Sequence, residues 1–353
     1  MGYGPFSKRI EKPAGRFRHF CRVMRPTLHP RLVNGRYGDP AVYVAALHRS
    51  QSLLFDLGDL AALPSRDLLR VAHVFVSHMH LDHFIGFDRL LRVNVGREKT
   101  IEIVGPAGIA EAVGHRLQSY TWDLVDGFSV DLVFEVYEIH SPGQLDAARF
   151  RLKAGFAREE GPKPPSWSGG MEIGWQDFRL RMTRLEHHHG VSLGFAVQEP
   201  LHVNIWRNRL DARGLKPGPW LQVLKRALYE GAGDGAPMPL PDGSEASLGS
   251  LRDLASIEPG QKVVYVTDIS DTAENREAVI ALADHADILF IDASFAAADA
   301  ALARQRGHLT TAAAGEIGRA ARVKRIEPFH FSPRYETDEQ RLLDEVYSAF
   351  EAA

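Results

Sequence analysis

The seven residues Ser77-His78-Met79-His80-Leu81-Asp82-His83 decide the fold of this 353-residue chain. They follow directly on an apolar run that begins at Val71 and is typical of a buried strand. On a helix, His78 and His80 would point about 200° apart, so a tight turn leaving the strand fits better. There, His78 and His80 can face one ion while Asp82 and His83 face a second. A histidine-rich surface loop explains this density of ligands poorly, so the stretch predicts the two-metal site of a hydrolase.

Further ligands are expected at the ends of other strands, because four side chains cannot complete two metal sites. His187 ends an alternating strand at 178–186, Asp268 follows the apolar strand 263–266, and His330 follows the strand 325–329. Each of these residues alone is more typical of a structural or solvated side chain. The predicted ligands are His78, His80 and His187 for one ion, and Asp82, His83 and His330 for the other, with Asp268 bridging the two ions. Asp82 is also expected to orient the attacking hydroxide.

Asp56 lies at the end of a short apolar strand, residues 52–56. It is either an acceptor for the second nitrogen of a ligand imidazole or a cap of the turn that follows the strand. The sequence leaves both interpretations open.

Composition limits the kind of metal site and the kind of protein. With one cysteine, Cys21, and sixteen histidines, imidazole and carboxylate must hold any metal, which suits zinc or another borderline divalent ion. The basic segment Met1–Arg22 lacks the apolar core of a signal peptide, and no stretch is long enough to span a bilayer, so we expect a cytoplasmic protein. A net charge of −3 argues against polyanion binding by the whole surface.

Strands alternate with helices along the chain, which predicts an α/β fold. An early hairpin, 41–47 with 52–56, makes the sheets mixed. The Gly-, Pro- and charge-rich residues 141–170 are predicted to be a loop or a loosely packed insertion. The other predicted strands are 71–77, 100–104, 130–139, 178–186, 193–198, 263–266, 288–291 and 325–329. The predicted helices are 64–70, which Ser65 would cap, and 84–92, 109–120, 274–285 and 310–321.

Residues 201–230 are predicted to form an appended helical arm, and 231–250 its Gly- and Pro-rich return. The arm has six basic side chains against two acidic ones, Asp211 and Glu230, which predicts a local phosphate-binding surface. The basic residues are Arg207, Arg209, Arg213, Lys216, Lys225 and Arg226. A solvated amphipathic helix pair or a dimer contact remains the alternative.

The chain resembles the metallo-β-lactamase superfamily, specifically its ribonuclease Z branch. The resemblance rests on the segments Phe55–Gly58, His78–His83, Leu185–His187 with Gly194-Phe195, Thr267-Asp268, Gly307–Thr310 and His330–Tyr335. It implies a four-layer αβ/βα sandwich in a single domain, 1–353, with an inserted arm, 201–250. It also implies two Zn²⁺ ions, with Mn²⁺ or Fe²⁺ as alternatives, and a homodimer in which one subunit's arm serves the other's site.

The same resemblance assigns roles to residues that their positions alone do not single out. His308, in Gly-His-Leu-Thr where the branch has Gly-His-Ser-Thr, is expected at the scissile phosphate as a proton donor. Asp292 stands where the branch has glutamate and is expected to support His308. The arm segment 214–220 looks like the Gly-Pro motif that grips tRNA, with Gly218 and Pro219 at its centre.

One ligand stays ambiguous within His187-His188-His189. The strand before it favours His187, whereas counting back from Gly194-Phe195 favours His188.

The leading hypothesis for function is an endonuclease that cuts tRNA precursors with zinc-bound hydroxide. A dizinc hydrolase of a small ester, lactone or other phosphodiester is the alternative, because the fold alone does not fix the substrate. A metal-stabilised RNA-binding protein without activity is a third hypothesis, disfavoured by the complete ligand set.

Overall fold

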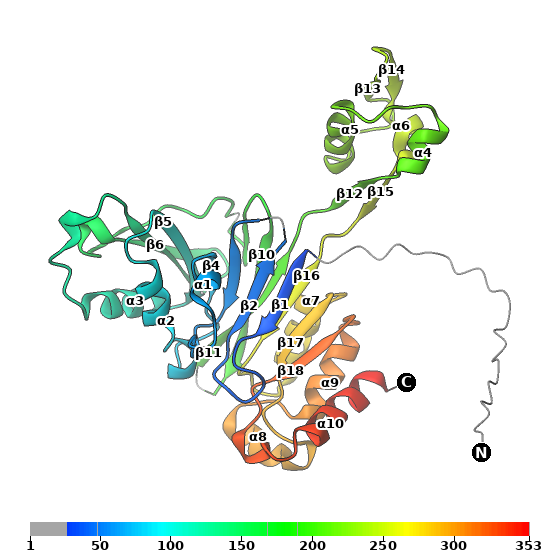
Figure 1. Cartoon of the computed structure of the whole chain (residues 1–353). Coiled ribbons are helices and arrows are strands. Elements are labelled where there is room, and N and C mark those ends of the chain that lie inside the picture. Colours follow the sequence, from blue (N-terminus) through cyan, green and yellow to red (C-terminus); the bar gives the residue numbers. More distant parts are fainter. Residues whose placement is uncertain (1–26, 48, 168, 189, 353) are drawn as a thin grey trace, which may run out of the picture.

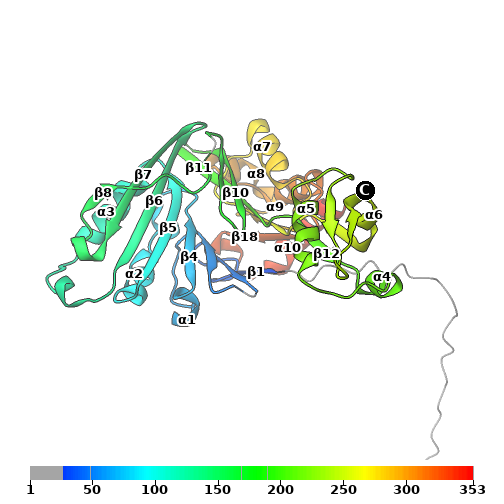
Figure 2. The ribbon, with the colours of Figure 1, turned by 90° about the horizontal axis from the view of Figure 1, so that it is seen from above.

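Two β-sheets packed face to face, each covered on its outer side by helices, form the body of the protein (Figure 1). The computed structural model describes residues 27–352 except 48, 168 and 189, so Met1–Arg22, Cys21 and His189 lie outside the described residues. Viewed from above, the layers follow one another as helices, sheet, sheet and helices (Figure 2). The predicted four-layer αβ/βα arrangement is therefore confirmed.

The first sheet has eight strands in chain order, β1 to β8. The strands are β1 (Leu28–Leu32), β2 (Val42–Ala46), β3 (Ser52–Phe55), β4 (Val71–Phe75), β5 (Lys99–Pro106), β6 (Leu132–Ser141), β7 (Gln144–Arg151) and β8 (Arg158–Glu160). β3 to β6 are parallel, and the strands on both sides of them are antiparallel. The predicted hairpin is confirmed as β2 and β3.

The prediction of a loop at 141–170 was wrong, since β7 and β8 extend the sheet there. In β7, buried Ala148 and Phe150 alternate with half-buried Arg149 and Arg151. Those arginines are held by ion pairs: Arg149 with Glu135 at 2.7 Å, and Arg151 with Glu159 of β8 at 3.1 Å. The charged residues that led to the loop prediction therefore lie on the outer face of a hairpin at the edge of the sheet.

The second sheet has six strands in the order β18-β17-β16-β11-β10-β9. They are β9 (Glu172–Gly174), β10 (Arg179–His187), β11 (Gly190–Gln198), β16 (Lys262–Val266), β17 (Ile288–Asp292) and β18 (Ile326–Phe329). β16, β17 and β18 are parallel, so their carboxyl ends meet at one edge of the sheet. At this edge the backbone N–H of Leu193 in β11 donates to the carbonyl of Ser77 (2.8 Å), joining the sheets beside the histidine cluster.

Helices cover both outer faces, and none of the described helices has the length and apolar character that crossing a bilayer demands. The first sheet carries α1 (Ser65–Leu68), α2 (Phe87–Asn94) and α3 (Ile109–Gln118), and the second carries α7 (Ala273–Ala283), α8 (Ala300–Arg306), α9 (Thr311–Ala320) and α10 (Glu339–Glu351). The predicted cap at Ser65 was wrong, because Pro64 takes the N-cap position and no side chain caps this helix. α8 and α10 were not predicted.

Gly86 sets where α2 begins. A Cβ at this position would lie 2.1 Å from the carbonyl oxygen of Gly58, so only glycine permits this approach. The metal-ligand turn therefore packs directly on the loop after β3, and α2 begins at Phe87 rather than at residue 84.

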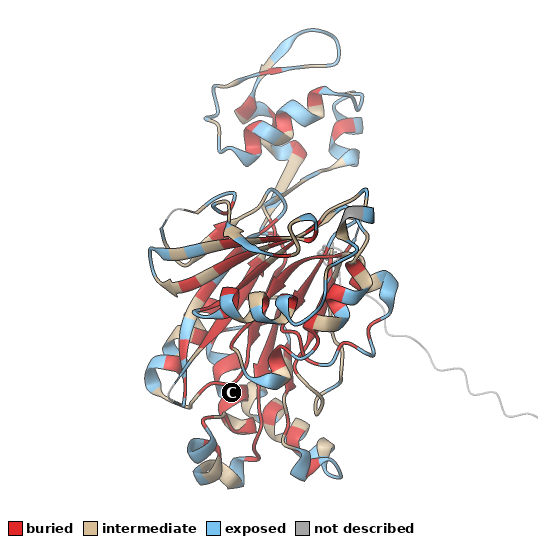
Figure 3. Ribbon diagram, turned by 90° about the vertical axis from the view of Figure 1, so that its left-hand side faces the viewer, coloured by how far each residue is buried: buried red, intermediate tan, exposed pale blue. Residues whose placement is uncertain are grey.

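Residues 202–258 project from the body between β11 and β16 (Figures 1 and 3). Two antiparallel strands, β12 (His202–Ile205) and β15 (Ala255–Glu258), form a stalk. Beyond it lie α4 (Arg207–Ala212), α5 (Trp220–Tyr229), the hairpin β13 (Pro237–Pro239) with β14 (Glu245–Ser247), and α6 (Leu248–Leu251). Leu210, Trp220, Leu224 and Leu248 are buried in a core separate from those of the body. The segment thus ends at residue 258 rather than at 250.

Because this arm has its own core, we expect the body to fold without it. A chain in which a short Gly-Ser turn replaces residues 202–258 should unfold within about 4 °C of the full chain, a shift of roughly 1 kcal/mol. Thermal unfolding followed by circular dichroism measures this. A loss of cooperative unfolding would show that the arm is part of the folding unit.

Candidate metal centre

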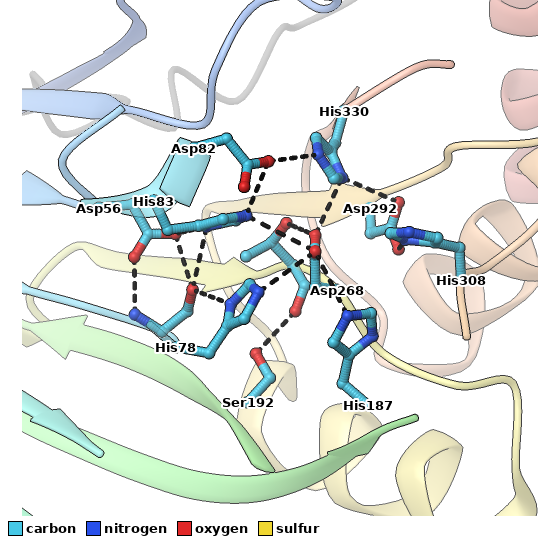
Figure 4. Close-up of polar contacts among 12 residues, drawn as sticks. Asp56, His78, Asp82, His83, His187, Ser192, Asp268, Asp292, His308 and His330 are labelled. Carbon is cyan, nitrogen blue, oxygen red and sulfur yellow. Dashed lines mark hydrogen bonds and ion pairs between the residues drawn. The ribbon is translucent and has the colours of Figure 1, made fainter. Parts of the chain in front are cut away.

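The predicted ligand residues converge at the edge where the sheets are joined (Figure 4). His78, Asp82 and His83 come from the turn after β4, and His187 is the last residue of β10. Asp268 lies two residues beyond the end of β16, and His330 directly follows β18. The backbones of Asp268 and His330 have φ values of 50° and 59°, in the left-handed region that non-glycine residues seldom adopt. Such strained turns are typical of functional sites, where the surrounding structure holds them.

One group of side chains surrounds the first predicted ion. His78, His80, His187 and Asp268 each offer a ligand atom within 4.8 Å of the others. Asp268 Oδ2 lies 3.4 Å from His78 Nε2 and 3.7 Å from His187 Nε2. All but His80 are buried.

A second group lies beside it. Asp82 Oδ2 is 3.5 Å from His83 Nε2 and 3.6 Å from His330 Nε2. Asp268 also reaches this group, since its Oδ2 is 3.5 Å from His83 Nε2 and its Oδ1 is 2.9 Å from His330 Nδ1. The structure thus brings all seven predicted ligands together and places Asp268 between the two groups.

The donor set fits a pair of borderline divalent ions. Of the described residues, His78 and His83 each bury an Nε2 atom that has no hydrogen-bond partner in the protein. Those two nitrogens face Asp268, where an ion would satisfy them. Imidazole and carboxylate donors in this number fit a binuclear site.

Protonation in the absence of metal differs among the ligand imidazoles. Burial, together with the neighbouring His83, lowers the pKa of His78 to about 2. Burial also opposes the charged forms of His83 and His330, yet Asp268 raises the pKa of both rings well above its usual range. In turn, burial favours the neutral form of Asp268, but the charges of His330 and His83 hold its pKa well below normal. Metal binding must displace the protons of His83 and His330.

Asp56 lies behind the turn as an acceptor for a ligand imidazole, one of its two predicted roles. Its buried carboxylate accepts from His83 Nδ1 (2.7 Å), the Ser77 backbone N–H (2.6 Å), the Ser77 hydroxyl (2.8 Å) and the Tyr265 hydroxyl (2.6 Å). With Nδ1 engaged, His83 is oriented so that its Nε2 faces the predicted ion. Tyr265 was missed by sequence reasoning, because it lies within an apolar strand and nothing in the pattern marks its hydroxyl.

The geometry favours His187 over His188. His187 Nδ1 donates to the carbonyl of Gly307 at 2.9 Å, which directs Nε2 toward Asp268. His188 is exposed and has φ of 50°.

His308 lies at the edge of the second group with Asp292 behind it. His308 Nδ1 is 3.0 Å from Asp292 Oδ2, so aspartate reaches the ring although it is shorter than glutamate. Burial disfavours a charged His308, but the Asp292 carboxylate raises the pKa of this ring above its usual value. Asp292 also accepts from the backbone N–H (3.1 Å) and hydroxyl (2.6 Å) of Ser294, which fixes its orientation.

Two pockets adjoin the cluster, each lined by different members of it. The His308 pocket, about 410 Å³, is lined by Asp82, His308 and His330 together with Tyr37, Arg306 and Arg334. The His78 pocket, about 560 Å³, is lined by His78, His80 and His187 together with Ile139, Arg184 and Val191. Both are within the size range of ligand sites in proteins.

Comparisons with known proteins identify relatives along most of the chain, although no family model matches it. Ribonuclease Z of Deinococcus radiodurans is 32% identical over 309 residues, which cover 85% of this chain and 88% of that protein. Ribonuclease BN of Cronobacter sakazakii is 30% identical over 319 residues, covering 87% of each.

Two solved structures show the same fold. Human tRNase Z, short form, superposes with a TM-score of 0.51 at 18% identity, covering 88% of this chain and 92% of that one. The metallo-beta-lactamase fold protein YhfI from Bacillus subtilis gives 0.50 at 15% identity, covering 91% and 92%.

Removing the Asp56 carboxylate charge should weaken metal binding without removing a ligand. We expect Asp56→Asn to lower metal affinity by about 10- to 100-fold, because an amide group puts a donor in place of one of the two oxygens that accept from Ser77, Tyr265 and His83, and so disturbs the orientation of His83. Competition with a chromophoric chelator measures this. Asp59→Asn is the matched control, since the exposed side chain of Asp59 accepts only from the backbone N–H of Ala61 among the described contacts. Equal affinities for both variants would contradict the orienting role.

Proposed function

This chain belongs to the ribonuclease Z family of metallo-β-lactamase fold proteins, and on that premise we propose that it cleaves tRNA precursors at their 3′ ends. It is a metal-dependent hydrolase of the ribonuclease Z/BN branch. The observation that supports the phosphodiester substrate is the Asp292–His308 pair at the mouth of the metal cluster. A protonated imidazole there suits a reaction in which a basic alkoxide leaves.

Two ions held by the seven residues would supply a hydroxide at neutral pH and stabilise charge on the phosphate. Zinc is the metal that we propose, with Mn²⁺ or Fe²⁺ as alternatives. Asp82 lies half exposed between His83 and His330, where its carboxylate can accept a proton from the attacking water. Burial opposes the charged form of Asp82, but the neighbouring His330 and His83 rings outweigh it and hold the pKa of this carboxyl below its usual range, so it is ionised for this task.

His308 is the proposed general acid. Asp292 holds Nδ1, which leaves Nε2 to give a proton to the leaving oxygen. Because Asp292 raises its pKa, His308 carries this proton at a higher pH than an ordinary histidine, and the rate should fall as pH rises through that pKa.

The His308 pocket provides groups for the RNA on that side of the bond. Arg306 and Arg334 line it, and the Arg334 guanidinium lies 5.8 Å above the Phe295 ring. Arginine beside an aromatic ring is a combination that binds phosphate and stacks on bases.

The arm is proposed to hold the body of the RNA, but its charge is less one-sided than the sequence window indicated. Residues 201–258 contain seven basic and seven acidic side chains. Arg207 pairs with Asp211 at 3.0 Å, Arg213 pairs with Asp253 at 2.7 Å, and Arg209 donates to the Asp253 carbonyl. The gripping role therefore falls to Lys216, next to the Gly218-Pro219 turn, and to Lys225 and Arg226 on α5. The homodimer that the family resemblance implies stays a prediction.

His308→Ala should separate substrates by their leaving group. We expect kcat on a tRNA precursor to fall by about 10²- to 10⁴-fold, because the ribose oxygen leaves without a proton. Hydrolysis of bis-p-nitrophenyl phosphate should change much less, since p-nitrophenolate is a weak base. A panel of lactones is the third set of substrates. Cleavage of lactones alone, unaffected by the substitution, would favour the small-ester alternative.

Neutralising Lys216, Lys225 and Arg226, which form no ion pair or side-chain hydrogen bond with the described residues, should weaken RNA binding. For Lys216→Gln/Lys225→Gln/Arg226→Gln we expect Kd for a tRNA precursor to rise at least about tenfold, and the salt-dependence slope to fall by about three. Filter binding at several salt concentrations measures both quantities. Arg207→Gln, whose charge is already paired, is the control, and bis-p-nitrophenyl phosphate hydrolysis should be unchanged in both. Equal losses in binding and small-diester hydrolysis would make the arm a structural support.

A further inference from the structure

Arg184 is an exposed residue of β10 that follows two core residues on the same face of the strand. Side chains alternate along a strand, so Leu180, Met182 and Arg184 share one face of β10. Leu180 and Met182 are buried in the core between the two sheets, whereas Arg184 is exposed. Arg184 thus continues the inner face of the sandwich to the edge that carries the metal cluster, three residues before His187.

At that edge residues of both sheets line the His78 pocket. Pro106, Ala107 and Ile139, at the ends of β5 and β6, form one wall, and Val191 of β11 lies on the other. The inner end is formed by His78, His80 and His187. Histidines apart, Arg184 is the one ionisable side chain among the described residues that line this pocket.

The guanidinium of Arg184 has no partner that would explain its position. Across residues 27–352, as far as the structure describes them, no carboxylate forms an ion pair with it. A planar cation beside apolar walls suits a ligand with an anionic group and an apolar face, which is the chemistry of a nucleotide.

The two pockets adjoin different metal ligands: Asp82 and His330 line the His308 pocket, and His78, His80 and His187 line the His78 pocket. In the proposed reaction, hydroxide forms a bond to phosphorus while the P–O3′ bond breaks, and O3′ takes the bonding electron pair and a proton from His308. The nucleotide that leaves with a free 3′-hydroxyl therefore lies on the His308 side. The nucleotide that keeps the phosphate has to extend away from His308, toward the His78 pocket.

We propose that the His78 pocket binds the first trailer nucleotides, those 3′ of the cleaved bond, and that Arg184 contacts the phosphate between the first and second of them. This rests on the proposed function and adds the direction in which the RNA strand crosses the metal centre. Arg184 is then a substrate-binding residue rather than part of the catalytic machinery.

The test combines a variant with a neutralised phosphate. Arg184→Gln is compared with Arg181→Gln, which removes an exposed arginine from the opposite face of the same strand. The substrates are a tRNA precursor with a short trailer, the same RNA with a methylphosphonate between the first and second trailer nucleotides, and one with a methylphosphonate one linkage 5′ of the cleaved bond. Bis-p-nitrophenyl phosphate is the fourth substrate.

We expect Arg184→Gln to lower kcat/KM on the unmodified precursor by about tenfold, the size of a lost charge-assisted hydrogen bond. The trailer methylphosphonate should lower kcat/KM of the wild-type protein by the same factor. It should lower kcat/KM of Arg184→Gln no further. The upstream methylphosphonate should affect wild type and variant equally. Arg181→Gln should behave as wild type. Both variants should hydrolyse bis-p-nitrophenyl phosphate, which lacks a trailer phosphate, at the wild-type rate.

Three results would overturn the proposal. If the two losses add on the trailer-modified RNA, Arg184 does not contact that phosphate. If Arg184→Gln lowers small-diester hydrolysis to the same extent, the substitution disturbs the metal centre. If the wild-type protein hydrolyses the small diester and no precursor, the proposed function itself fails and the trailer subsite fails with it.

Discussion

The buried carboxylate of Asp268 is the interaction on which the rest of the centre depends. It lies between four imidazoles at 2.9 to 3.7 Å, with no water-exposed side to compensate its charge. An isolated carboxylate in such a place would be neutralised or expelled. Cations must therefore balance it: protonated His83 and His330 when no metal is present, and metal ions when they are bound.

The site could be predicted from the sequence to a large extent, because its members are ligand types that follow apolar strands. His78, Asp268 and His330 each follow such a strand, and parallel strands bring their carboxyl ends to one edge. Tyr265 and Arg184 escaped prediction for one common reason. Each lies inside a strand, and its role depends on what the facing sheet places opposite it, which local periodicity does not encode.

The fold was predictable where apolar residues recur at regular spacing along a segment. It was missed in β7, where charged residues interrupt that spacing. β7 carries its buried pair, Ala148 and Phe150, among arginines whose ion pairs are with β6 and β8. The window 201–230 holds six basic side chains against two acidic ones, but Asp253, which pairs with Arg213, comes after that window. Both patterns depend on contacts with residues that lie farther along the chain, which a local stretch of sequence does not reveal.

Each group of ligands has members that water reaches: His80 in the first, and half-exposed Asp82 with partly exposed His330 in the second. An ion can therefore exchange one bond at a time, from the solvent side, while the buried ligands stay in place. Metal can then leave by ligand exchange while the chain stays folded. A cell that starves the protein of metal would be left with a folded, refillable apoprotein instead of a denatured one.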